Sequence, residues 1–156
     1  MLKIALIHPE IPFNTGNIGR TCAATGAQLH LVAPLGFSLS ERRIRRAGMD
    51  YWERLAPTLH ESLEDFLSYI GADEKLLAFS AEGALTHYQA PYGSDSWLVF
   101  GSESAGLPVE LRRRWRERLY RIPMVPGARS LNLSTAAAVV LYEALRVSTP
   151  SPSLWS

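Results

Sequence analysis

The sequence is poor in cysteine: Cys22 is the single one among 156 residues. One cysteine excludes a disulfide within the chain, and in a segment of small residues it is better explained as packed apolar volume than as a nucleophile. The four histidines are scattered and have no metal-ligand spacing with Cys22. We therefore expect no disulfide framework and no metal.

Long apolar runs are missing as well. The chain has no stretch of about 18 consecutive apolar residues, the length that a membrane-spanning helix needs. Its start, MLKIALIHPE, lacks the long apolar stretch and small-residue cleavage site of a secretory signal. We expect a cytoplasmic protein with no membrane partner.

Net charge is nearly absent, at +1 with 16 basic and 15 acidic residues. A charge this small gives the whole molecule no attraction for nucleic acid, so binding to a polyanion would depend on local arginine clusters.

A phosphate-binding lysine is missing from the stretch LVFGSESAGLP, residues 98–108, where an apolar segment enters a glycine-rich turn. A Walker loop would end in Gly-Lys-Ser/Thr, but here Gly106 is followed by Leu107. The dinucleotide fingerprint fails too, because Glu103 replaces its glycine and a carboxylate would repel a polyphosphate. The pattern favours a neutral or cationic ligand.

Apolar and helical segments alternate along the chain, which predicts an α/β fold with a mostly parallel sheet flanked by helices. Continuous apolar runs predict strands buried on both faces, at residues 2–8, 29–34, 75–81, 96–101 and 120–125. Helices are predicted from Asn14 as N-cap, and over residues 39–48, 60–71, 109–119 and 132–146. We expect one domain over residues 1–148 and a loose tail over 149–156, which is rich in proline and serine.

Three segments place glycine, asparagine or serine where a predicted strand meets a helix, the usual ligand position in open α/β sheets. They are NTGNIGR (14–20), FGSESAG (100–106) and IPMVPGARSLNLS (122–134). Taken singly, each has a purely structural explanation, as a helix cap or a turn.

Together, and in this order, the three segments resemble the three motifs of the SpoU branch of the SPOUT class of RNA methyltransferases. The resemblance extends from PEIPFNTGNIGRT through RRAGMDYW to RIPMVPGARSLNLSTAAAVVLYEA. It points to the minimal tRNA wobble-nucleotide 2'-O-methyltransferases, which act on cytidine or uridine 34. It implies a C-terminal trefoil knot, a homodimer, and methyl transfer from S-adenosyl-L-methionine with S-adenosyl-L-homocysteine as product. The implied partner is the tRNA anticodon stem-loop, and we expect no DNA partner.

The implied cofactor pocket uses backbone groups and an apolar slot. The residues that we expect to contact S-adenosylmethionine are Phe79, Gly101, Ile122, Met124, Ser130 and Leu131. Glycine at position 101 would let the backbone approach the ligand closely.

Arg20 is the main catalytic candidate, because it matches the arginine that ends the first motif. The pKa of an arginine lies above about 12, so its guanidinium is a poor proton acceptor. Arg20 would more easily stabilise negative charge or hold a phosphate. Ser130 and Asn132 would orient the hydroxyl and the cofactor, although Asn132 is also placed to cap the last helix. Glu103 would sense the sulfonium, hold Asn14 or Arg20, or cap the following turn, and a structural role is favoured.

RNA binding is expected from Arg42, Arg45 and Arg46, which fall on one helical face. Tyr51 and Trp52 follow this cluster and are candidates for stacking on bases. The arginines from 112 to 114 stand between Glu110 and Glu117 and indicate a solvated face with internal ion pairs instead. Two alternatives stay open: a non-catalytic RNA-binding or ribosome-assembly module with this fold, and a Rossmann-type nucleotide enzyme.

Overall fold

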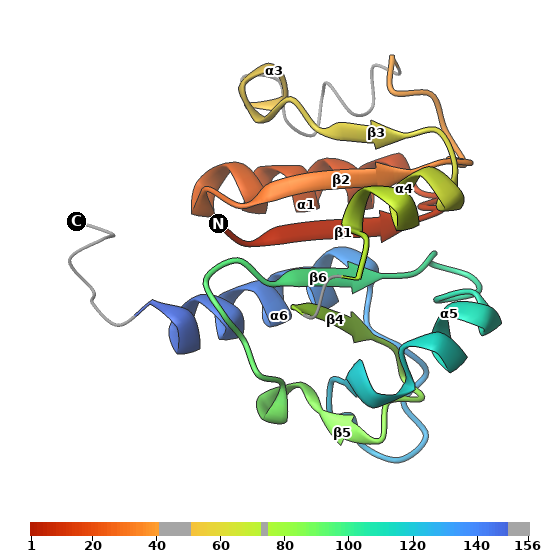
Figure 1. Cartoon of the computed structure of the whole chain (residues 1–156), viewed down its shortest axis with the longest axis vertical. Helices are drawn as coiled ribbons and strands as arrows, with labels where there is room; N and C mark the ends of the chain where they lie inside the picture. Colours follow the sequence, from red (N-terminus) through yellow and green to blue (C-terminus); the bar gives the residue numbers. More distant parts are fainter. Residues whose placement is uncertain (41–50, 73–74, 150–156) are drawn as a thin grey trace.

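The computed structural model describes residues 1–40, 51–72 and 75–149 and contains one parallel sheet (Figure 1). Among these residues seven strands pair in the order β3-β2-β1-β6-β4-β7-β5, and every neighbouring pair is parallel. The strands are β1 (Lys3–Ile7), β2 (Gln28–Val32), β3 (Thr58–His60), β4 (Leu76–Phe79), β5 (Leu85–Thr86), β6 (Trp97–Phe100) and β7 (Leu119–Arg121). The predicted parallel α/β fold is confirmed.

Helices cover both faces of the sheet, and Figure 1 shows α1 and α6 together behind it. The helices are α1 (Pro12–Thr25), α3 (Trp52–Leu55), α4 (Leu63–Ile70), α5 (Val109–Arg114) and α6 (Leu133–Ser148), with 3-10 turns η1 (His87–Gln89) and η2 (Arg116–Arg118). None of the helices in the described part of the chain has the length and apolar character that crossing a bilayer requires.

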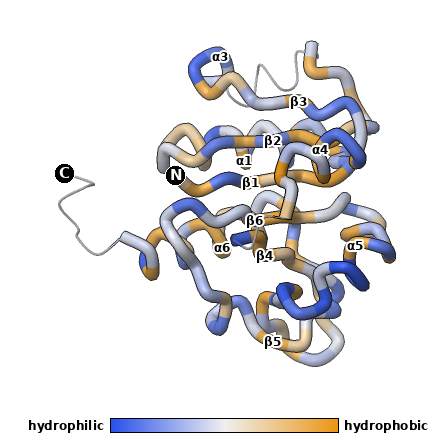
Figure 2. The backbone as a smooth tube through the Cα atoms, in the orientation of Figure 1, coloured by the Kyte–Doolittle hydropathy of each residue, from blue (hydrophilic) through white to orange (hydrophobic). Residues whose placement is uncertain are grey.

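Successive side chains of β1 point to opposite faces of the sheet, and the core is therefore divided in two. Ile4 and Leu6 pack with α1 and α6, whereas Ala5 and Ile7 pack with α4 and α5, and all four are fully buried. Because both faces are covered, the central strands are continuously apolar, which Figure 2 shows against the strongly hydrophilic stretches around α5. The predicted solvated arginine face on α5 holds for Arg113 and Arg114, which are exposed, but is wrong for Arg112, which is half-buried and pairs with Glu82 instead of a neighbouring glutamate.

The predicted start of the first helix is wrong. The helix begins at Pro12 after the N-cap Ile11, whose side chain forms no capping hydrogen bond, and Asn14 lies buried within the first turn. Proline suits the first helical position because its missing N–H has no partner to lose there. The side-chain cap comes instead from a distant part of the chain, as described below.

Other boundaries differ for local reasons. The strand predicted over residues 120–125 ends at Arg121, because Pro123 and Pro126 cannot donate to a ladder. The helix predicted over 109–119 ends at Arg114 and continues as η2. The two-residue β5 and the three-residue β3 are too short to leave a sequence pattern. Most of the helix predicted over 39–48 and of the tail 149–156 lies outside the described residues, and the trefoil knot stays a prediction.

A histidine pair lies under the sheet edge formed by β2 and β3. His30 and His60 are both buried, and His30 Nδ1 lies 3.0 Å from His60 Nε2, so that one ring donates to the other. Burial lowers the pKa of His30 to about 4 and also lowers the pKa of His60. The fold therefore contains two imidazoles that are stable there only when neutral.

We expect this pair to destabilise the protein in mild acid. The unfolded chain takes up protons near an ordinary histidine pKa of about 6.5, so the stabilisation is complete above that pH and falls as the pH drops toward about 4. By pH 4 His30 alone should account for a loss of about 3 kcal/mol, and His60 adds to it. Urea unfolding at pH 7.5, 6, 5 and 4 measures it, and His30→Asn, which keeps a polar atom near Nδ1 without titrating, should flatten this slope. An unchanged slope in His30→Asn would contradict the assignment.

Candidate active site

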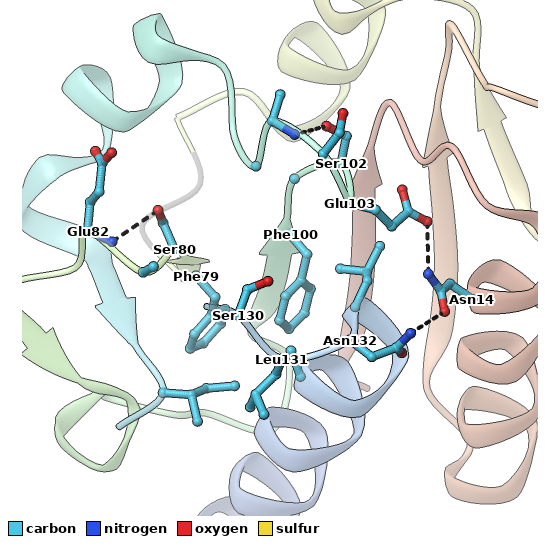
Figure 3. Close-up of a pocket in the computed structure, with 18 of the residues that line it drawn as sticks. Asn14, Phe79, Ser80, Glu82, Phe100, Ser102, Glu103, Ser130, Leu131 and Asn132 are labelled. Carbon is cyan, nitrogen blue, oxygen red and sulfur yellow. Dashed lines mark hydrogen bonds between the residues drawn. The ribbon is translucent and has the colours of Figure 1, made fainter. Parts of the chain in front are cut away.

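A pocket of about 560 Å³ opens at the carboxyl ends of β4, β6 and β7 (Figure 3). This is the edge at which open parallel sheets bind ligands, and the volume falls within the range of small-molecule sites. The segments that line it are far apart in sequence: the start of α1, residues 79–82, residues 100–106 and residues 122–133. All three predicted motif segments therefore contribute to one site.

The centre of the pocket is apolar. Phe79 and Phe100 stack with ring centroids 5.1 Å apart, and both residues end their strands at the pocket. Ile122, Met124 and Leu131 also line it, and Met124 and Leu131 are 37% and 39% exposed. A flat ring system would find apolar contacts on these side chains.

Gly101 allows a very close approach between two parts of the turn after β6. A Cβ atom at this position would lie 1.9 Å from the carbonyl carbon of Gly106. Ser102 and Gly106 close the turn with two backbone hydrogen bonds, of 3.1 and 2.9 Å. Glycine at 101 is thus required by the turn itself, which forms one wall of the pocket.

Glu103, at the tip of this turn, caps the first helix. Its Oε2 accepts a 2.7 Å hydrogen bond from the backbone N–H of Glu10, and its Oε1 accepts from the N–H of Ile11 at 3.0 Å. The same Oε1 accepts from Asn14 Nδ2 at 3.2 Å. A carboxylate at this helix end also opposes the positive end of the helix dipole. Of the alternatives considered for Glu103, the structure shows the hydrogen bond to Asn14, and a part in catalysis stays a prediction.

Asn14 continues the network to the last helix. Its Oδ1 accepts a 2.9 Å hydrogen bond from Asn132 Nδ2, so Asn14 uses both ends of its amide (Figure 3). Asn132 Oδ1 accepts from the N–H groups of Ser134 and Thr135, which confirms Asn132 as the cap of α6. One chain of hydrogen bonds therefore joins three segments that are remote in sequence.

Glu10 binds the same turn through its own side chain, at Ser104, the residue that follows Glu103. Its Oε1 accepts from Ser104 Oγ at 2.6 Å and from Ser104 N at 3.3 Å, and hydrogen bonds to Ser104 and Ser102 lower the pKa of this carboxyl. The sequence analysis missed Glu10. No local signal marks it, because its partner lies 94 residues away in the chain.

The predicted site residues separate into two groups. The six residues expected to contact the cofactor all line the pocket, as do Glu103, Ser130 and Asn132. Arg20 is outside this lining: it is exposed and follows Asn14 by six residues, about 9 Å along the axis of α1. Arg42, Arg45 and Arg46 lie outside the described residues.

The segment that follows the predicted RNA-binding arginines is fixed on α1 close to Arg20. Tyr51 donates its hydroxyl to the carbonyl oxygen of Gly16 at 2.5 Å, and a Cβ at Gly19 would lie 2.8 Å from the ring of Trp52. Burial raises the pKa of Tyr51, and the positive charge of Arg20 partly opposes this. Packing against α1 explains both aromatic rings, and stacking on bases stays a prediction.

The charges in the pocket do not suit a polyphosphate. Its charged lining residues are two carboxylates, Glu82 and Glu103, and one guanidinium, Arg112, which forms an ion pair with Glu82. Lysine does not occur among these described lining residues. An apolar centre with a small excess of negative charge fits an adenosine that carries a positively charged sulfur.

Comparisons with known proteins agree with this geometry. The model of the SpoU rRNA Methylase family matches residues 1–142. A tRNA (cytidine(34)-2'-O)-methyltransferase of Saccharophagus degradans is 47% identical over 147 residues, covering 94% of this chain and 95% of the relative. A structure solved to study 2-OH methylation of C/U34 on tRNA has 45% identity and a TM-score of 0.89, covering 94% and 95% of the two chains. The SpoU methyltransferase AviRb of Streptomyces viridochromogenes, solved with AdoMet, has 25% identity and a TM-score of 0.83, covering 94% of this chain and 57% of AviRb.

The Glu103 cap gives a direct test of the network. Glu103→Gln replaces one acceptor oxygen with an NH₂ group that faces N–H donors, so we expect a loss of about 1–3 kcal/mol in the free energy of unfolding. Urea unfolding measures the loss, and Glu117→Gln at an exposed glutamate is the matched control. Equal stability of the two variants would show that the carboxylate does not hold α1.

Proposed function

Because the chain belongs to the SpoU rRNA methylase family, we propose that it transfers a methyl group from S-adenosylmethionine to the ribose 2'-hydroxyl of tRNA nucleotide 34, a cytidine or uridine. One observation carries this proposal: the three motif segments meet in a single pocket, in a chain 47% identical to a cytidine(34) methyltransferase over 94% of its length. The product would be S-adenosylhomocysteine and a 2'-O-methylated anticodon.

S-adenosylmethionine would be held by Phe79, Gly101, Ile122, Met124, Ser130 and Leu131, which line the pocket. When bound, it supplies an electrophilic methyl group on a positively charged sulfur. The chain itself would provide apolar walls for the adenine, and the one guanidinium among the described lining residues is paired with Glu82.

Asn132 would act mainly by positioning. Its Oδ1 is engaged by the start of α6 and its Nδ2 donates to Asn14, so one amide hydrogen remains for a ligand. Ser130 is exposed, lines the pocket two residues earlier, and would present its hydroxyl to the cofactor or the ribose. Holding the reacting oxygen in line with the methyl carbon is the chief contribution expected from such residues.

Arg20 would stabilise the negative charge that develops on the 2'-oxygen, or hold a neighbouring phosphate. A guanidinium remains protonated at neutral pH and presents a fork of donors. Because Arg20 is outside the pocket lining, it would act on RNA that is bound beside the pocket, or it would act in the site of a partner subunit.

A homodimer would bring these parts together. Phe13 on α1 and Val139 and Tyr142 on α6 are exposed apolar side chains on two helices that contact each other. We propose that these helices form the contact, and that the anticodon stem-loop lies along the dimer with Arg42, Arg45 and Arg46 at its phosphates. A cytoplasmic location would place the enzyme with its substrate.

Label transfer tests the reaction. Purified protein with methyl-labelled S-adenosylmethionine should label an unmodified anticodon stem-loop, and nuclease mapping should place the label on nucleotide 34. An otherwise identical RNA with a 2'-deoxynucleotide at 34 removes the acceptor oxygen and should take no label. Labelling of this control, or none of either RNA, would refute the proposed reaction.

Arg20→Ala tests the catalytic assignment. We expect transfer to fall by about 100-fold or more, the size seen when one charge-stabilising donor is lost. Calorimetry should show S-adenosylhomocysteine binding unchanged, since Arg20 does not line the pocket. Arg113→Ala, an exposed arginine on α5, is the control. Full activity in Arg20→Ala would overturn the assignment.

A further inference from the structure

An ion pair stands on one side of the pocket. Arg112 Nη1, from α5, contacts Glu82 Oε1, from the segment that follows β4, and both residues line the cavity. The Arg112 side chain is 23% exposed and that of Glu82 is 65% exposed. Figure 3 places Glu82 across the pocket from Asn14 and Glu103. The pair is therefore separate from the network that joins α1 and α6.

The guanidinium of Arg112 is only partly satisfied. Its Nη1 serves Glu82, but its Nε is buried and has no hydrogen-bond partner among the described residues. A buried donor without an acceptor is costly. Because Arg112 lines the pocket, the guanidinium N–H groups that Glu82 does not engage can pair with a carboxylate there, which arginine binds through two parallel hydrogen bonds.

Glu82 is suited to the opposite charge. The other carboxylate of the pocket, Glu103, already accepts three N–H groups at the start of α1. Glu82 is mostly exposed, and among the described residues Arg112 engages only its Oε1. A cation on the ligand would therefore meet Glu82 rather than Glu103.

A ligand that matches the pair has one carboxylate and one ammonium close together. The amino-acid end of S-adenosylmethionine has this chemistry, whereas its adenosine is uncharged. We infer that Arg112 and Glu82 form the subsite for the amino-acid end, with Arg112 on the carboxylate and Glu82 on the ammonium. This inference rests on the proposed function, and it assigns the apolar centre between Phe79 and Leu131 to the adenine.

Two ligands separate this subsite from the rest of the pocket. S-adenosylhomocysteine carries the amino-acid end, and 5'-methylthioadenosine has the same thioether nucleoside without it. In Arg112→Gln, calorimetry should show binding of S-adenosylhomocysteine weakened about 10- to 100-fold, the range for one charge-assisted contact. Binding of methylthioadenosine should stay within about twofold. Arg113→Gln, on the same helix but exposed and outside the pocket, should change neither.

Glu82→Gln supplies a second variant, at an exposed position where the substitution should leave the fold intact. It should weaken the binding of S-adenosylhomocysteine by about 2- to 10-fold and leave the binding of methylthioadenosine unchanged. The loss is smaller than in Arg112→Gln because solvent screens the exposed carboxylate. Equal losses for both ligands would overturn the inference, because the pair would then serve the nucleoside or the pocket shape. Unchanged binding of both in Arg112→Gln and Glu82→Gln would overturn it too. Failure of the wild-type protein to bind either ligand would instead refute the proposed function.

Discussion

The Glu103 carboxylate at the first turn of α1 is the contact on which the site depends. It accepts two backbone N–H groups and the Asn14 amide, and so joins the turn after β6 to a helix that starts about 90 residues earlier. Asn14 then fixes Asn132, which caps α6. Without this carboxylate the N–H groups of Glu10 and Ile11 would lose their acceptor, and the hydrogen-bonded connection from the turn through Asn14 to α6 would be broken.

The same contact explains why a glycine-rich turn at a sheet edge is poorly suited to phosphate in this chain. In nucleotide-binding folds, the N–H groups at a helix start point at the ligand. In this chain Glu103 occupies that position and neutralises it, while Arg112 is neutralised by Glu82. The position of the pocket in the fold is therefore the usual one, but its electrostatics favour a ligand without phosphates, as the bound AdoMet of the AviRb neighbour illustrates.

The geometry also separates the pocket from Arg20. The pocket residues surround a cavity within one chain, whereas Arg20 lies further along α1 beside the packed segment of Tyr51 and Trp52. Such an arrangement suits an enzyme whose acceptor is a large RNA, because a large molecule can approach only from the surface. Under the proposed function, the cofactor would be held within one chain, and the charge of Arg20 would stand on the surface where RNA arrives.

The sequence by itself determined the parallel α/β fold, the three segments of the site and the absence of a phosphate-binding lysine, because these follow from local apolar patterns and from residue types. It also placed Asn132 at the start of the last helix, since a cap acts over two or three residues. Only the tertiary structure decided that Asn14 is buried rather than a cap, that Glu10 and Glu103 hold each other's segments, and that Arg112 meets Glu82. Those contacts join residues roughly 30 to 118 apart, and only the folded sheet brings them within hydrogen-bonding distance.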